Sequence, residues 1–182
     1  RCDNLDNGIP VLTLAAVTGF KYRETEYKTT SEIGSSNAHY WLNCNDILMT
    51  RSNTLELVGH AAIYNGRPSP CIYPDLMMKL QIDRSRVVPE FVIYWLQTAI
   101  VREYIKSNAK GTSPTMKKIN QAIVMNIPFP STTNLKQQRR MVDYLDTFQA
   151  KIDNLKRLQE QIQIELDALL PSILDKAFAG EL

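Results

Sequence analysis

The 182-residue sequence is poor in the side chains that most active sites require: it contains two histidines, three cysteines and seven glycines. The only histidines, His39 and His60, are 21 residues apart and no Cys-x-x-Cys motif occurs, which argues against a zinc site. The glycines are isolated, so the sequence has no glycine-rich phosphate loop. A nuclease centre would need an acidic residue followed by Glu-x-Lys, but Glu26-Tyr-Lys28 precedes Pro74-Asp75. We therefore expect no catalytic residue, no metal and no cofactor.

Long apolar runs are also missing. No stretch of 18 apolar residues and no secretory leader is present, so we expect no membrane contact and a cytoplasmic location. Three widely spaced cysteines, an odd number, fit a reduced compartment better than a disulfide framework. The formal net charge is only +2, so no strong overall basic field points to nucleic acid. The start at Arg1, without Met, suggests a fragment of a longer protein.

Glycine and proline are absent from residues 135–170, as a long uninterrupted helix requires. Apolar residues there recur at alternating spacings of three and four, close to the 3.5-residue period of a coiled-coil seam. The seam consists of Leu145, Phe148, Ile152, Leu155, Leu158, Ile162, Leu166, Leu169 and Ile173. At 1.5 Å per residue the helix would be roughly 50 Å long, so it needs a partner helix along its length. The alternative is an amphipathic helix that lies on its own domain.

The ends of this helix also carry signals. The N-cap residues of 131–134 precede it. Pro171 predicts a kink or break, followed by a final turn over residues 172–179 that stops at Gly180.

Short strands separated by turns are expected in the first half of the chain. We predict strands over residues 9–18, 47–50, 58–64 and 71–82, the last with a bend. Residues 19–37 are polar and predict a long exposed loop or loose hairpin. A helix is predicted over residues 89–108, a short helical turn over 116–123, and an extended strand over 124–130. The expected fold is α+β: a mixed-sheet domain over residues 1–130, followed by a long C-terminal coiled-coil helix over 131–182.

Basic and small polar residues gather between the predicted helix and the short turn that follows it. Five cations oppose Glu103 within seventeen residues: Arg102, Lys106, Lys110, Lys117 and Lys118. Thr112 and Ser113 lie between them, on a segment suited to contacts with phosphates and base edges. The alternative is a solvated helix face and its cap.

Two further segments are candidates for nucleic-acid contact. Arg51-Ser52-Asn53-Thr54 follows a buried strand, and Arg and Asn suit bidentate contacts to guanine and adenine. The alternative is an Arg51 that pairs with Asp46 and orders a turn. The third segment is the polar loop, which carries Lys21, Arg23 and Lys28.

The order of several motifs resembles one known family. Asn45-Asp-Ile-Leu-Met-Thr-Arg-Ser52 and Val58-Gly-His-Ala-Ala-Ile63 resemble the "GD-I-L-x-x-R … x-G-x-x-A" block of type I restriction–modification specificity (S) subunits, with Asn45 in place of the usual Gly. Lys110-Gly-Thr112, Ile127-Pro-Phe-Pro130 and Lys136-Gln-Gln-Arg139 resemble that family's "GT … IPLPPLxEQ" run. The end of the chain, residues 169–182, is similar to the family's closing helix.

The resemblance implies a non-catalytic role. Residues 1–130 would form a target recognition domain that reads one half of a split target in double-stranded DNA. Residues 131–182 would form a spacer helix that pairs antiparallel with that of a second recognition unit, in the same longer chain or in a homodimer. The partners would be methyltransferase (M) subunits and, through them, restriction (R) subunits of a bacterial or archaeal cell. The alternative is a coiled-coil module that binds protein and contacts DNA only incidentally.

Overall fold

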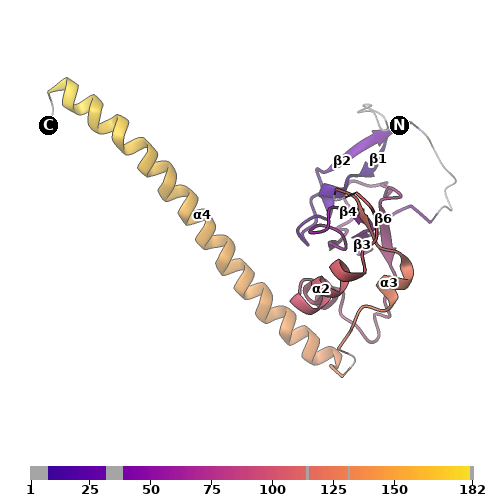
Figure 1. Ribbon diagram of the computed structural model, residues 1–182. Coiled ribbons are helices and arrows are strands. Elements are labelled where there is room, and N and C mark those ends of the chain that lie inside the picture. The colour runs from indigo at the N-terminus through magenta and orange to yellow at the C-terminus, as the bar shows by residue number, and fades with distance from the viewer. Residues whose placement is uncertain (1–7, 32–38, 114, 131, 181–182) are drawn as a thin grey trace. The chain divides into compact units, whose positions relative to one another are not determined.

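The computed structural model describes residues 8–31, 39–113, 115–130 and 132–180 of the chain (Figure 1). The chain divides into two compact units, Arg1–Arg139 and Arg140–Leu182. The described residues of the first unit form seven short strands, a 3₁₀ turn, three helices and the first turn of the fourth helix; those of the second continue that helix. This arrangement confirms the expected α+β class with a long C-terminal helix.

Strand β3 (Ile47–Thr50) is the centre of the first unit, and all four of its residues are buried. Ile47 and Met49 pack into a cluster with residues of two helices, among them Val92 and Val101. Leu48 points into a second cluster around Leu12, Tyr64 and Met77. Both faces of the strand are covered, which explains why its sequence is continuously apolar rather than alternating.

The strands form three small antiparallel sheets. β3 lies between β5 (Ala61–Ile63) and β6 (Met77–Leu80). β1 (Ile9–Leu12) pairs with β2 (Tyr27–Thr30), and the two lie side by side in Figure 1. β4 (Ser52–Asn53) pairs with β7 (Lys117–Lys118). One parallel bridge, between Val11 and Ile72, supplies the mixed character.

Several predicted strands are shorter in the structure. The strand expected over residues 9–18 ends at Leu12, because η1 (Leu14–Ala16) turns the chain and closes it with a bond from Val17 N to Leu14 O. The strand expected over 58–64 begins only at Ala61, and the one over 71–82 is limited to β6 and the bridged Ile72. The predicted loop over 19–37 contains β2, while residues 32–37 of that prediction lie outside the described residues.

The helix predicted over residues 89–108 is two helices. α1 (Pro89–Leu96) and α2 (Ala99–Asn108) are separated at Thr98, whose backbone is extended. The Thr98 hydroxyl donates to the Trp95 carbonyl at 2.8 Å, so the side chain occupies an acceptor at the end of α1. This is the competition between a threonine side chain and the helical backbone that apolar periodicity does not register.

The predictions for residues 116–130 are wrong in their secondary structure. Lys117–Lys118 is strand β7 rather than a helical turn, since it finds a partner in β4. α3 (Gln121–Met125) begins at Asn120, whose Oδ1 accepts from Ile123 N at 2.9 Å. Residues 126–130 have no regular structure, and Trp95 Nε1 donates to the Pro128 carbonyl. Prolines keep this segment extended but deprive it of the donors that a strand needs.

Helix α4 (Leu135–Ala179) starts at the predicted cap. Asn134 Oδ1 accepts from Gln137 N at 2.9 Å, and Gln137 Oε1 accepts from Asn134 N at 3.0 Å, a reciprocal capping box. Of the kink or break predicted at Pro171, the break is wrong, since the helix continues through this residue to Ala179. An internal proline removes one backbone bond, which a helix already formed on both sides can tolerate. Gly180, at φ +72°, provides the expected stop.

Candidate nucleic-acid interface

The backbone of Arg51 is held from two sides at the end of β3. Its N–H donates to the Leu76 carbonyl at 2.9 Å, just before β6. Its carbonyl accepts from Ile119 N at 2.9 Å, just after β7. Three segments that are far apart in sequence therefore meet at this residue.

The β4–β7 ribbon continues the same junction. Ser52 lies opposite Lys118 and Asn53 opposite Lys117. Lys110 adds a second layer, since its N–H donates to the Lys118 carbonyl at 2.9 Å and its own carbonyl accepts from Lys118 N at 2.7 Å. The structure thus brings together two candidate segments that the sequence presents separately. We call Arg51, Asn53, Lys110, Lys117 and Lys118 the basic edge.

The charge of the basic edge is positive. Lys110 and Lys118 are exposed, and Lys117 is half-buried with its Nζ donating to the Gly111 carbonyl at 2.7 Å. Gly111 has φ +142°, and a Cβ there would lie 2.5 Å from the Met116 carbonyl, so only glycine fits this turn. The carboxylate of Asp75 lies 3.1 Å from Arg51.

The other predicted contacts near this edge differ in accessibility. Thr112 and Ser113 are exposed, and the hydroxyl of Ser113 lies 2.8 Å from that of Thr115. Thr54 is half-buried, and its N–H donates to Asn53 Oδ1 at 2.9 Å. Ser52 is 3% exposed, and its hydroxyl has no partner among the described residues. A buried hydroxyl cannot reach a DNA surface in this conformation.

Among the described residues, the hydrogen bonds of the third candidate segment, which carries Lys21, Arg23 and Lys28, do not involve the basic edge. Lys28 is an exposed residue of β2, and Lys21 is exposed in the preceding loop. Arg23 donates to the carbonyls of Ala15 and Thr18 at 2.8 and 2.7 Å, so its side chain closes the turn around η1. Within the described ranges, no hydrogen bond joins these three residues to the basic edge.

Two members of the predicted basic cluster have internal partners instead. Arg102 donates to the carbonyls of Val58 and Glu56 at 3.0 and 2.9 Å. Lys106 pairs with Glu56 at 2.5 Å, and its hydrogen bond holds the pKa of the Glu56 carboxyl below the ordinary value. These side chains hold the loop between β4 and β5 against α2. That leaves the cations of the basic edge for an external ligand.

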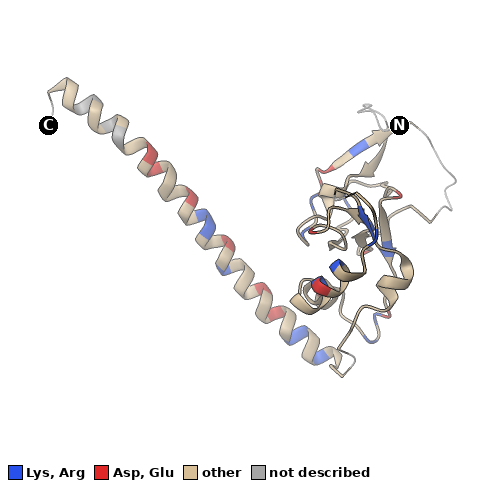
Figure 2. Cartoon of the chain, in the orientation of Figure 1, with Lys and Arg blue, Asp and Glu red and all other residues tan. Residues whose placement is uncertain are grey.

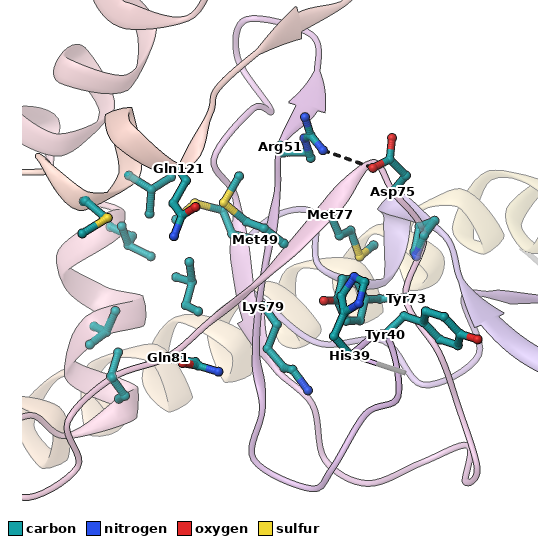
Figure 3. Close-up of a pocket in the computed structure, with 18 of the residues that line it drawn as sticks. His39, Tyr40, Met49, Arg51, Tyr73, Asp75, Met77, Lys79, Gln81 and Gln121 are labelled. Carbon is teal, nitrogen blue, oxygen red and sulfur yellow. Dashed lines mark hydrogen bonds and ion pairs between the residues drawn. The ribbon is translucent and has the colours of Figure 1, made fainter. Parts of the chain in front are cut away.

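The alternative considered for Arg51, an ion pair with Asp46, is not formed. Asp46 bonds Lys79 at 3.1 Å, while Arg51 bonds Asp75 (Figure 3). Sequence reasoning missed Asp75 because the residue is 24 positions from Arg51. Its position directly after Pro74, ahead of an apolar strand, is the one local signal of a turn.

A cleft of about 1800 Å³ borders this ion pair. Its floor includes the apolar side chains of Met49 and Met77, and Gln121 comes from the start of α3. His39, Tyr40 and Tyr73 lie at the other end of the view in Figure 3. Sequence reasoning did not find this cleft, since its lining comes from seven separate segments of the chain.

A metal site would require several titratable side chains to lie close together. In the part of the chain that the structure describes, no three His, Cys, Asp or Glu side chains cluster in a way that suits a metal ion. Burial and the nearby Arg102 lower the pKa of His60 to about 4, and its Nδ1 accepts from Gly19 N at 3.0 Å. No helix among the described residues is both long and apolar enough to cross a membrane.

The second unit presents the predicted seam. All eight seam residues named as the helix interface are 37–59% exposed: Leu145, Phe148, Ile152, Leu155, Leu158, Ile162, Leu166 and Leu169. Acidic and basic residues are interspersed along the rest of α4, as Figure 2 shows. The seam is an apolar stripe along α4 that the helix itself leaves exposed.

Comparison with known proteins identifies the family. A family described as "Type I restriction modification DNA specificity domain" matches residues 3–165. The StySPI specificity subunit of Salmonella potsdam is 28% identical over 144 residues, which are 79% of this chain and 31% of that protein. The EcoEI specificity subunit of Escherichia coli is 25% identical over 172 residues, 91% of this chain and 28% of that protein.

A more distant relative and a solved structure agree with this match. The putative MjaX specificity subunit of Methanocaldococcus jannaschii is 22% identical over 170 residues, 93% of this chain and 40% of that protein. A chain from a structural study of complex assembly and conformational transition of the type I R-M system superposes with a TM-score of 0.64 at 26% identity. That superposition covers 97% of this chain and 40% of the other.

The present chain therefore spans well under half the length of the specificity subunits it matches. The family match over residues 3–165 nevertheless includes nearly all of the first unit and most of α4. The chain belongs to the type I restriction modification DNA specificity domain family.

Proposed function

We propose that the chain is one DNA-reading unit of a type I restriction–modification specificity subunit. Residues 1–130 form the recognition domain, which binds one half of a split target in double-stranded DNA. Residues 131–182 form the spacer. The unit directs methyltransferase subunits, and through them restriction subunits, and performs no catalytic step itself. The site of action is the cytoplasm of a bacterial or archaeal cell.

The gathering of the basic edge supports this proposal best. Three segments that carry these five residues are joined through their backbones, because the Arg51 carbonyl accepts from Ile119 N and β4 pairs with β7. Arg and Asn supply the donors and acceptors that suit base edges, while the lysines suit phosphates. We propose that Arg51 and Asn53 face bases and that Lys110, Lys117 and Lys118, with Thr112 and Ser113, contact the backbone.

The buried and separate residues have smaller roles. Ser52 and Thr54 shape the β4–β7 ribbon rather than contact DNA directly. Lys21, Arg23 and Lys28 are proposed to touch DNA only if the duplex extends past the β1–β2 hairpin.

The test is a binding selection followed by salt titration. The chain, alone and assembled with methyltransferase subunits, is used to enrich duplexes from a random library. A Lys117→Gln/Lys118→Gln variant should then bind all duplexes more weakly and flatten the log–log salt slope by about 1.8, since each lost phosphate contact contributes about 0.9. The matched control is Lys151→Gln/Lys156→Gln on α4, which should leave the slope unchanged.

Two results would contradict the proposal at different levels. An unchanged slope in the Lys117/Lys118 variant would mean that these lysines are only solvated. A library that yields no preferred sequence, with and without methyltransferase subunits, would remove DNA reading as the function.

A second candidate is a protein-interaction module, which the exposed seam of α4 favours. The two functions are compatible if the seam pairs with the helix of a second recognition unit, and we propose that this pairing is antiparallel. The helix would then set the distance between two DNA-reading units. Insertion of one seven-residue repeat keeps the seam in register and lengthens α4 by about 10 Å, close to three base-pair steps. A preferred target spacing that stays the same would leave α4 as a dimer contact only.

A further inference from the structure

The ion pair between Arg51 and Asp75 has a feature that phosphate binding does not require. Arg51 Nη1 lies 3.1 Å from Asp75 Oδ1, and no other side chain among the described residues bonds this guanidinium. A single contact leaves the remaining N–H donors of the guanidinium free. The Arg51 side chain is 41% exposed and that of Asp75 is 94% exposed, so both are open to a ligand.

The backbones that carry the pair are fixed relative to each other. Arg51 N donates to the Leu76 carbonyl, next to Asp75, at 2.9 Å. Met77 N donates to the Pro74 carbonyl at 3.0 Å, which closes a turn around Asp75. The pair is therefore built on one hydrogen-bonded junction, not on two independent loops.

The lysines of the basic edge lack a comparable carboxylate. Lys117 Nζ is bonded to a backbone carbonyl, and no ion pair of Lys110 or Lys118 is present among the described residues. Arg51 is thus the one cation of the edge whose charge is balanced locally. A balanced cation adds little to the sequence-independent attraction of phosphates, which depends on the number of charges neutralised.

Base reading has different requirements. A guanine presents O6 and N7 side by side in the major groove, and an arginine matches them when its planar fork is held in one orientation. A carboxylate bonded to one nitrogen restricts that orientation and leaves the other donors to the base. The second oxygen of Asp75 is available to accept from an exocyclic amino group, such as N4 of cytosine.

We propose that Asp75 is a specificity-determining residue of this domain. It positions the Arg51 guanidinium for a guanine edge and keeps that charge from binding phosphates of unrelated sequences. The inference rests on the proposed DNA-reading function and deepens it, since it assigns one base position to one ion pair.

The test compares the base preference and salt dependence of four proteins: the unaltered chain, Asp75→Asn, Arg51→Ala and Glu103→Gln. Each is assembled with methyltransferase subunits and used to enrich duplexes from a random library. Affinities are then measured for the sequence selected by the unaltered chain and for a scrambled duplex of equal length. Glu103 lies on the exposed face of α2, so Glu103→Gln reports the effect of removing one negative charge elsewhere.

The expected result has three parts. Asp75→Asn and Arg51→Ala lose the preference at the same guanine position, and discrimination between the two duplexes falls roughly tenfold. Asp75→Asn binds the scrambled duplex more tightly, with a salt slope steeper by about 0.9, because Arg51 is released to a phosphate. Glu103→Gln changes neither the selected sequence nor the slope.

Three outcomes overturn the proposal. If Asp75→Asn selects the same sequence at every position, Asp75 has no part in reading while the DNA-reading function stands. If Asp75→Asn and Glu103→Gln tighten binding equally and uniformly, the effect is general electrostatics. If the unaltered complex selects no sequence, the proposed function fails together with this inference. Asp75 is almost fully exposed, so its replacement does not disturb the core, and an Asp75→Ala variant provides an independent repeat.

Discussion

Replacement of Gln138 by alanine should destabilise the first unit, although the residue belongs to the first turn of α4. Gln138 is 1% exposed. Its Oε1 accepts from Val88 N at 2.9 Å, and its Nε2 donates to the carbonyls of Arg86 and Thr133 at 3.2 and 3.1 Å. One amide therefore ties the start of α4 to the residues that lead into α1.

The magnitude follows from the groups that the substitution would leave unpaired. Each hydrogen bond contributes about 1 kcal/mol net, and a buried donor without a partner costs about 1–3 kcal/mol. Val88 is the N-cap of α1, so its N–H has no helical acceptor to replace Gln138. The two carbonyls regain part of their bonding from water. We expect Gln138→Ala to lower the free energy of unfolding by about 3 kcal/mol.

Two measurements check this expectation. Urea unfolding of the whole chain gives the loss of free energy, with Gln149→Ala as the matched control. Gln149 is exposed on the same helix and bonds only Asp153 among the described residues, so its replacement should cost less than about 0.5 kcal/mol. Amide hydrogen exchange gives the local effect, which should be largest at Val88.

The reasoning would be refuted if the free energy of unfolding of Gln138→Ala differed from that of the unaltered chain by less than about 0.5 kcal/mol, the size of an ordinary surface change. Unchanged exchange at Val88 would also refute it, because the bond from Gln138 would then contribute no protection.

The remaining predictions concern a titrating residue and the seam. The pKa of His60 is lowered from 6.5 to about 4 by burial and by the Arg102 cation, so the unfolded chain binds a proton before the folded one does. The free energy of unfolding should therefore fall as the pH drops from 6.5 towards 4, by about 1–2 kcal/mol after allowance for partial exposure. His60→Gln should flatten this part of the curve of unfolding free energy against pH. An equal slope in both proteins would contradict the prediction. Leu155→Lys should weaken self-association, or pairing with a second unit, at least tenfold in sedimentation measurements. Gln159→Lys on the same helix should leave the association unchanged. Equal effects of the two variants would show that the added charge, not the seam, controls pairing.

Patterns confined to a few neighbouring residues were readable in advance. Residues Ile47–Thr50 were predicted as a short buried strand, and the structure confirms it. The α4 helix was predicted by spacing and by the absence of glycine and proline, and its cap by the N-cap residues of 131–134, of which Asn134 makes the capping bond. Such features depend on local geometry, because a period of 3.5 residues or a buried run is a property of the segment itself.

Breaks between elements were less predictable. Thr98 separates α1 from α2 through its own hydroxyl, but the apolar spacing of residues 89–108 continues across it. Lys117 and Lys118 have no intrinsic preference for a strand and become β7 because β4 is there to pair with them. Pro171 was expected to interrupt α4 and does not.

The composition and motif order of the sequence by themselves determined the family, the absence of recognisable catalytic motifs, the long helix and the buried central strand. Only the tertiary structure decided which charged side chains meet. Arg51 lies beside Asp75 and not Asp46. The backbones of Lys117 and Lys118 lie next to Ser52 and Asn53 because two-residue strands 64–66 positions apart pair with each other, and Lys110 bonds Lys118 through the backbone. Contacts of this kind depend on where the chain returns after long loops, and no local period or propensity encodes that return.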